Sequence, residues 1–183
     1  MYRIFDFILS LLGLILLIPI FLLLYLIGLF FVSKPIFLQQ RVGRNGRPFM
    51  LVKFRTMPIG TASVASHELL PVALNGWFKF LRKYKLDELL QLFNVLWGDM
   101  SFVGPRPCLP NQLELVQLRT DRNLFRVRPG ITGLAQLRGV DMSVAPLLVE
   151  QEEELLRRLT PLIYIQIILK TFTGKGSGDA VRF

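Results

Sequence analysis

The sequence contains one cysteine, Cys108, and one histidine, His67, among its 183 residues. A single cysteine excludes an intramolecular disulfide and a metal cluster held by several thiolates. A catalytic triad with a histidine base would depend entirely on His67, which we interpret as a loop residue because it lies in a polar stretch. We interpret Cys108 as a small packing residue. The chemistry of this chain is therefore expected to rest on other side chains.

Acidic residues are also scarce: 13 Asp and Glu oppose 22 Lys and Arg, which gives a formal net charge of +9. The chain is nevertheless 52% hydrophobic, and its length suits one domain with a real core. A basic and apolar chain favours a membrane surface with anionic lipids, or phosphorylated substrates. Nucleic acid is the competing partner, but no helix-turn-helix, zinc-finger or aromatic-basic RNA motif occurs. We therefore expect membrane lipids and no nucleic acid as partners.

The N-terminal residues 4–32 are nearly all apolar. At about 1.5 Å per residue, a straight helix of this length exceeds the roughly 30 Å hydrocarbon core of a bilayer. Pro19 predicts a break in the helix, and basic residues on both flanks favour the cytoplasmic face for both ends. We therefore predict that residues 1–33 form a re-entrant membrane-anchoring helix that enters and leaves by one leaflet. An ordinary tilted transmembrane helix is the alternative.

A β-hairpin is predicted directly after this segment. Asn45-Gly46 separates two apolar runs over 35–40 and 49–54, which is a typical hairpin pattern. Lys53 and Arg55 alternate with Phe54, so we expect both basic side chains on one face of the second strand.

A helix is predicted from Leu86, because apolar residues recur at helical spacing as far as Trp97, and Gly98 is a stop signal. Asp87 and Glu88 are expected in its first turn, where unpaired N–H groups and the helix dipole keep a carboxylate ionised. Such a place suits a carboxylate nucleophile or a metal ligand, although simple helix capping is a common alternative. Asp87 shares its stripe with Gln91 and Asn94, which we expect to leave room for a substrate.

The segments KLDELLQLFNVLWGDMSFVGPRP (85–107) and RPGITGLAQLRG (128–139) follow an apolar N-terminus and KFRTM (53–57). This combination resembles the bacterial sugar transferases, the small monotopic phosphoglycosyl transferases. The resemblance implies that Asp87 is the nucleophile and that Glu88 is its acidic partner and a ligand of Mg²⁺. The substrate-phosphate contacts that it implies are Lys53, Arg55, Arg82, Arg106, Arg128 and Gln136. Two departures are Leu90, where the family usually has proline, and Ile18, where it usually has serine before the helix-breaking proline.

This family resemblance also implies a reaction. A sugar-1-phosphate would pass from a UDP-sugar to a membrane polyprenyl phosphate, with undecaprenyl phosphate expected, and UMP would be released through a covalent aspartyl phospho-sugar. Such a protein would perform the first membrane step of glycoconjugate or polysaccharide synthesis, at the cytoplasmic face of the bacterial inner membrane. A homodimer is left open. The alternatives are a catalytically diverged glycan-assembly protein that retains the fold, and a metal-dependent lipid diphosphate phosphatase.

The resemblance fades after Gly139. A helix is predicted over 111–126, and the acidic cluster of Glu150 and residues 152–154 is interpreted most simply as a solvated face. Residues 155–172 are predicted as an interfacial helix beside the membrane, with burial against the catalytic domain as an equal alternative. The predicted class is α+β: the re-entrant helix, then a small, mostly helical catalytic domain over 34–183 with a short β-hairpin and interfacial amphipathic helices.

Overall fold

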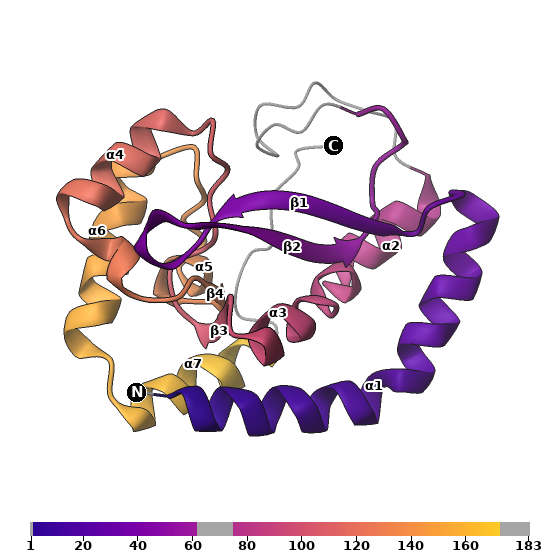
Figure 1. Cartoon of the computed structure of the whole chain (residues 1–183), viewed down its shortest axis with the longest axis horizontal. Helices are drawn as coiled ribbons and strands as arrows, with labels where there is room; N and C mark the ends of the chain where they lie inside the picture. The colour runs from indigo at the N-terminus through magenta and orange to yellow at the C-terminus, as the bar shows by residue number, and fades with distance from the viewer. Residues whose placement is uncertain (1, 62–74, 173–183) are drawn as a thin grey trace.

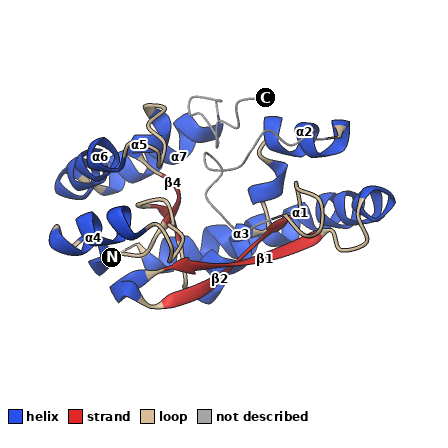
Figure 2. Ribbon diagram, turned by 90° about the horizontal axis from the view of Figure 1, so that it is seen from above, coloured by secondary structure: helices blue, strands red, loops and turns tan. Residues whose placement is uncertain are grey.

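The computed structural model describes residues 2–61 and 75–172. His67 lies outside the described residues. The described helices and strands are α1 (Arg3–Phe31), β1 (Ile36–Val42), β2 (Pro48–Phe54), α2 (Gly76–Lys83), α3 (Gln91–Trp97), β3 (Ser101–Val103), α4 (Leu113–Asp121), β4 (Gly130–Thr132), α5 (Leu134–Leu137), α6 (Ala145–Arg158) and α7 (Pro161–Phe172). Short 3-10 turns are η1 (Arg44–Gly46), η2 (Leu86–Glu88) and η3 (Leu124–Arg126). Helices predominate around small sheets, which confirms the predicted mixture of helix and sheet (Figure 1, Figure 2).

The helix α1 is bent, and both of its arms pack against the rest of the molecule. Pro19 lies inside the helix, and Figure 1 shows a sharp turn between the two arms. Proline lacks a backbone N–H and clashes with the preceding turn, so a bend is expected there. The first arm contributes Leu14 to the cluster around α3, and the second contributes Leu24 to a cluster with Phe54 and Leu81. The predicted apolar helix and its bend are confirmed.

The outer surface of α1 is apolar along most of its length. By length and composition α1 is able to cross a membrane: its most apolar window has a mean hydropathy of 3.1, and 17% of that window is buried. Ile4, Leu16 and Phe30 are among its exposed side chains. So much contiguous exposed apolar surface is typical of a membrane or interaction site.

The strands β1 and β2 form the predicted hairpin. They are antiparallel, with Phe37 opposite Lys53 and Val42 opposite Pro48. In the turn Asn45 has a φ of 57° and Gly46 a φ of 72°. The turn therefore needs the left-handed backbone region, which glycine and asparagine tolerate better than other residues. Figure 2 shows the hairpin as a ribbon beside α3.

The strands β3 and β4 are short and parallel, and their backbones approach closely at Gly104 and Gly130. A Cβ atom added to Gly130 would lie 2.1 Å from the nitrogen of Gly104, so a side chain does not fit there. The N–H of Gly104 donates to the carbonyl of Thr132 at 2.9 Å, and that of Gly130 donates to the carbonyl of Pro105 at 2.8 Å. These contacts join the Gly-Pro-Arg-Pro segment (104–107) to the glycine-rich segment (128–139), which is distant from it in sequence.

The C-terminal part differs from the sequence prediction. The helix expected over 111–126 is the shorter α4 followed by η3, and residues 155–172 belong to two helices, α6 and α7. The helix α7 buries Tyr164 and Ile167 in the main core but leaves Leu162 and Leu169 exposed. Glu152 is only 2% exposed, so the acidic cluster is not simply a solvated face.

Candidate active site

The two acidic residues Asp87 and Glu88 lie in a 3-10 turn, not in the first turn of an α-helix. The turn η2 contains both residues, and α3 begins only at Gln91. Lys85, directly before η2, has a left-handed backbone with a φ of 55°. The sequence prediction of one uninterrupted helix from Leu86 is therefore wrong. Because the field of a helix dipole falls off within a turn, Asp87 gains less from the α3 dipole than a first-turn residue would.

The helix α3 is fixed against the hairpin by Asn94, whose side chain is completely buried. Its Oδ1 accepts a hydrogen bond from the N–H of Val52 at 2.9 Å, and its Nδ2 donates to the carbonyl of Met50 at 2.7 Å. The expectation that Asn94 leaves room for a substrate is therefore wrong. Gln91, on the same stripe, does line a pocket.

The other end of α3 is held by the N-terminus of α1. Gly98 has a φ of 96° and ends the helix, as predicted. The guanidinium group of Arg3 donates to the carbonyl of Val95, and its Nη2 donates to that of Leu96 at 2.6 Å. A cation at these unpaired carbonyl groups complements the negative end of the helix dipole. The helix α3 thus connects α1 to the turn η2, which contains Asp87 and Glu88.

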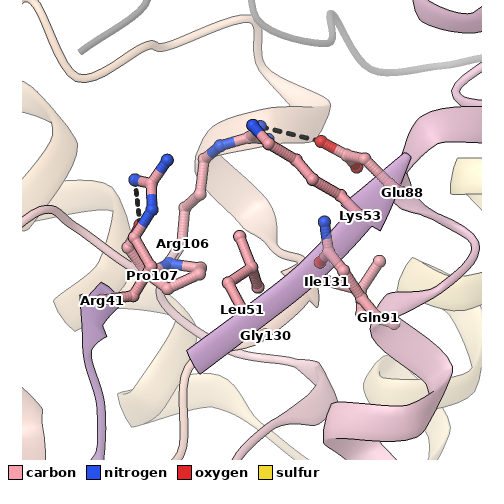
Figure 3. A pocket seen from close by; sticks show the side chains of 9 residues that line it. All are labelled: Arg41, Leu51, Lys53, Glu88, Gln91, Arg106, Pro107, Gly130 and Ile131. Carbon is pink, nitrogen blue, oxygen red and sulfur yellow. Dashed lines mark hydrogen bonds and ion pairs between the residues drawn. The ribbon is translucent and has the colours of Figure 1, made fainter. Parts of the chain in front are cut away.

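A pocket opens where the hairpin, η2, α3 and the β3–β4 region meet (Figure 3). Three cationic side chains and one carboxylate line it, so it carries an excess of positive charge. Its lining residues are Arg41, Leu51, Lys53, Glu88, Gln91, Arg106, Pro107, Gly130 and Ile131. Such a hollow is suited to phosphate groups, which guanidinium and ammonium groups bind with charge-assisted hydrogen bonds.

Glu88 and Arg106 form an ion pair at the edge of this pocket. Nη2 of Arg106 lies 2.9 Å from Oε1 of Glu88, and the two side chains are 18% and 19% exposed. Figure 3 shows the end of Lys53 at the same place and the guanidinium group of Arg41 on the opposite side. Pro105 and Pro107 flank Arg106 and restrict the backbone there. Three of the predicted site residues are therefore brought together: Lys53, Glu88 and Arg106.

Lys53 and Arg55 share one face of the hairpin, as predicted. The Nζ of Lys53 lies 5.5 Å from the ring centroid of Phe37, and the guanidinium carbon of Arg55 lies 4.9 Å from it. Arg55, however, donates from its Nε to the carbonyl of Lys34 at 2.9 Å and does not line the pocket. Its contact with a substrate phosphate stays a prediction.

Asp87 and Arg82 lie outside the lining of the pocket. Asp87 is half-buried and precedes the pocket residue Glu88 in η2. The Nε of Arg82, in the last turn of α2, donates to the hydroxyl of the buried Thr56 at 3.0 Å. Arg82 thus joins α2 to the end of the KFRTM segment.

Arg128 and Gln136 are placed away from the pocket lining. The Nε of Arg128 donates to the carbonyl of Gly98 at 2.7 Å. Burial, then the positive charges of Arg44 and Arg3, lower the pKa of Arg128. Gln136 is buried in α5, and its Nε2 has no hydrogen-bond partner within the described residues. Their predicted substrate contacts stay predictions, and the structure gives Arg128 a structural contact instead.

The residues present suit Mg²⁺ only in part. Magnesium is often held by one or two carboxylates together with substrate phosphates, rather than by an all-protein cage. The described residues contain no group of three or more acidic, histidine or cysteine side chains that would form such a cage. Glu88, beside a cationic pocket, fits the first arrangement.

Sequence reasoning did not indicate Ile131, counted Arg41 only among the basic residues that flank the N-terminal apolar segment, and placed Gln91 only on the stripe shared with Asp87. Gln91 follows Glu88 at helical spacing, which was the available signal. Arg41 reaches the pocket because Nη1 donates to the carbonyl of Pro107 at 2.9 Å, a contact between distant segments. No local pattern in the sequence indicates that contact.

Comparison with known proteins identifies related sequences. The family model of the bacterial sugar transferases matches residues 1–175. An uncharacterized sugar transferase, EpsL, of Bacillus subtilis is 46% identical over 111 residues, which cover 59% of this chain and 54% of the relative. The undecaprenyl-phosphate galactose phosphotransferase of Salmonella typhimurium is 42% identical over 118 residues, covering 55% and 25%. The UDP-glucose:undecaprenyl-phosphate glucose-1-phosphate transferase of Klebsiella pneumoniae is 42% identical over 108 residues, covering 57% and 23%. The match thus spans about half of the first relative and about a quarter of the other two.

Proposed function

This chain belongs to the bacterial sugar transferase family, and we propose that it transfers a sugar-1-phosphate from a UDP-sugar to a membrane polyprenyl phosphate, releasing UMP. The observation that carries this proposal is the cationic pocket beside the acidic turn. The names of two relatives, which act on undecaprenyl phosphate, support the same acceptor for this chain.

The lining of the pocket supplies cationic groups of the kind that bind a diphosphate. Arg41, Lys53 and Arg106 surround a hollow with one carboxylate. The guanidinium group of Arg106 already binds one carboxylate oxygen of Glu88, and the same donors are suited to phosphate oxygens. Because Arg106 and Glu88 are each partly exposed, a substrate is able to reach both.

The proposed reaction has two displacement steps. A carboxylate oxygen of Asp87 bonds to the phosphorus that carries the sugar, and the phosphoanhydride bond breaks so that UMP leaves with the electron pair. A phosphate oxygen of the polyprenyl phosphate then bonds to the same phosphorus, and the Asp87 carboxylate is released. A covalent route divides one difficult step into two easier ones. Asp87 directly precedes the pocket residue Glu88 in η2, which supports its assignment as the nucleophile.

Mg²⁺ is proposed as the cofactor, with Glu88 as a protein ligand. When bound, the ion would neutralise charge on the diphosphate. The protein's own part is to hold the diphosphate with Lys53 and Arg106 and to keep the Glu88 carboxylate beside it. Arg55, Arg82, Arg128 and Gln136 are retained as proposed further phosphate contacts, although they lie outside the pocket lining.

The location proposed is the cytoplasmic face of the bacterial inner membrane, with α1 as a re-entrant anchor. A straight helix of 29 residues is about 44 Å long at 1.5 Å per residue and would place its ends at opposite faces. In this molecule Arg3 contacts the end of α3, and Phe31 stacks on Trp77 of α2 with ring centroids 5.6 Å apart. Because both ends of α1 contact the same folded body, the structure supports entry and exit through one leaflet.

The test is UMP release from a panel of UDP-sugars with undecaprenyl phosphate in mixed micelles. We expect turnover with at least one sugar, loss of turnover in Asp87→Asn, and a phospho-sugar adduct on the peptide containing Asp87 when the lipid acceptor is omitted. An active Asp87→Asn enzyme would refute the covalent role. A folded wild-type protein that turns over no UDP-sugar would favour the diverged glycan-assembly protein.

A further inference from the structure

The side chain of Gln91, the first residue of α3, is almost completely buried and lies at the pocket. It is 5% exposed and lines the pocket together with Lys53, Glu88 and Arg106. Figure 3 shows this side chain extending from α3 toward the pocket, with its amide end on the side of Lys53. Within the described residues, no protein group forms a hydrogen bond with this amide.

The fold gives the next polar side chain of this stripe a structural role that Gln91 lacks. The amide of Asn94 has two partners in the hairpin, the N–H of Val52 at 2.9 Å and the carbonyl of Met50 at 2.7 Å. Buried polar groups in native proteins nearly always have such partners, because a missing hydrogen bond costs free energy. The amide of Gln91 faces the pocket, so its partner is water or a ligand there.

An amide supplies what the other polar groups of the pocket do not. Arg41, Lys53 and Arg106 are donors only, and an ionised Glu88 is an acceptor only, whereas an amide donates and accepts. Phosphate oxygens without protons only accept, so the three cations are sufficient for them. A hydroxyl group donates and accepts, and therefore matches an amide.

The sugar is the part of the donor substrate that brings hydroxyl groups closest to the reacting phosphorus. In the proposed reaction Asp87 attacks the phosphorus that carries the sugar, and the ribose lies one phosphate further away. Asp87 and Glu88 occupy η2, and Gln91 begins α3 three residues after Glu88. The amide is thus near the end of the pocket at which the transferred group is expected.

We propose that Gln91 is a specificity-determining residue, whose amide forms a hydrogen bond with a hydroxyl group of the transferred sugar. This inference rests on the proposed function. A sugar without that hydroxyl would displace water from the amide without replacing its hydrogen bond, and a site built for a hydroxyl rejects such an analogue.

The experiment compares the wild type with Gln91→Met, which keeps an unbranched side chain but removes the amide. The kcat/KM for UMP release is measured for the preferred UDP-sugar and for its deoxy analogues, each without one hydroxyl. We expect the wild type to reject one analogue by about 10- to 100-fold, and Gln91→Met to lose most of this discrimination. Equal discrimination by both proteins against every analogue would overturn the proposal.

Stability separates this role from a structural one. Because Gln91→Met breaks no hydrogen bond within the described residues, it should unfold at the temperature of the wild type or above it. Asn94→Ala, which loses two hydrogen bonds, should unfold at a lower temperature. A destabilised Gln91→Met with the discrimination of the wild type would assign Gln91 to the fold and overturn the proposal. Gln117→Met, on the exposed side of α4, is the kinetic control and should behave as the wild type.

Binding gives a readout that does not depend on turnover. In the Asp87→Asn background, in which the proposed covalent step is blocked, calorimetry measures the affinity for UDP and for each UDP-sugar of the panel. We expect Gln91→Met to weaken binding of at least one UDP-sugar by about 10-fold and to leave binding of UDP unchanged. Equal weakening for UDP, or no weakening for any UDP-sugar, would overturn the proposal. Selective weakening in a protein whose wild-type form releases no UMP would support the sugar contact and refute the proposed function.

Discussion

The hydroxyl group of Tyr164, in α7, donates a hydrogen bond to the carboxylate of Asp6, in α1, across 158 residues of sequence. Asp6 is 2% exposed and also accepts from the hydroxyl of Ser101 at 2.9 Å and from the N–H of Phe102 at 3.3 Å. The buried carboxylate of Asp6 therefore accepts three hydrogen bonds. Loss of this carboxylate would remove the acceptor of all three donors. Through Asp6, the helix α1 is thus hydrogen-bonded to the buried interior of the rest of the molecule.

Removal of this carboxylate should destabilise the fold. We expect Asp6→Ala to lower the free energy of unfolding by about 2–3 kcal/mol, because buried donors then lose their acceptor. Chemical denaturation in detergent measures this. Tyr164→Phe removes one donor and should cost less, about 1 kcal/mol. Equal stability of Asp6→Ala and the wild type would show that the network contributes nothing.

Alkaline pH should weaken the same network. Burial, and then the hydrogen bond to Asp6, raise the pKa of Tyr164 above its ordinary value. A phenol with a raised folded-state pKa binds its proton more tightly in the native state, so its contribution is fully present below the ordinary tyrosine pKa of about 10 and is lost as the pH rises above it. Unfolding curves from pH 8 to 11 should show a decline that is smaller in Tyr164→Phe. An identical decline in both proteins would contradict this assignment.

Features with a local cause were predictable from the sequence. Pro19 bends α1 through its missing N–H, Asn45 and Gly46 form the hairpin turn, and Gly98 ends α3. The parallel pairing of β3 with β4 was not predictable in this way. It depends on the close approach of Gly104 to Gly130, two residues that no short-range pattern connects.

In the candidate site, too, some features were predictable from local sequence motifs and others depend on contacts between distant segments. The motifs indicated Lys53, Glu88 and Arg106, and the structure brings them together. Arg128, in an equally basic motif, instead donates to the end of α3 at Gly98, because a helix terminus attracts a guanidinium group as a phosphate does. The burial of Glu152 was hidden because its ion-pair partner belongs to another helix, α4.

The junction of α3 and β2 yields a stability prediction at Asn94. In Asn94→Asp a carboxylate oxygen replaces the Nδ2 that donates to Met50, so two acceptors face each other in a fully buried place. Loss of this donor should cost about 2–3 kcal/mol in the free energy of unfolding at neutral pH. Thermal unfolding measures it, with Gln117→Glu on the exposed side of α4 as the control. Unchanged stability of Asn94→Asp would mean that α3 is held by its apolar contacts alone.

Mg²⁺ should be required for turnover, through Glu88. The Glu88→Gln variant retains an oxygen that accepts from Arg106 but loses the charge that attracts a cation. We expect its turnover to fall and its Mg²⁺ titration to shift to higher concentrations. Mg²⁺ is usually bound by only one or two protein carboxylates, so the loss of one weakens its binding. Binding of Mg²⁺ to the protein with UDP, followed by calorimetry, gives a second readout. Full turnover by Glu88→Gln in the presence of a chelator would remove both Glu88 and the ion from the mechanism.

The path of α1 gives the last prediction. Both ends of the bent helix contact the same folded body, the first through Arg3 and the second through Phe31, whose ring stacks on Trp77 with centroids 5.6 Å apart. An anchor that enters and leaves by one leaflet leaves both ends on the cytoplasmic side. A transmembrane helix would separate them by the roughly 30 Å hydrocarbon core.

Cysteine labelling in intact spheroplasts distinguishes the two paths of α1. Cys108 is fully buried, and Cys108→Ser gives a background without native thiols. In that background a cysteine added at the N-terminus and one introduced as Ser33→Cys should both be shielded from a membrane-impermeant maleimide, and both should react after permeabilisation. Labelling of the N-terminal cysteine alone in intact spheroplasts would establish a membrane-crossing helix. The contacts of Arg3 with α3 would then be incompatible with the membrane-bound protein, because the two would lie on opposite sides of the bilayer.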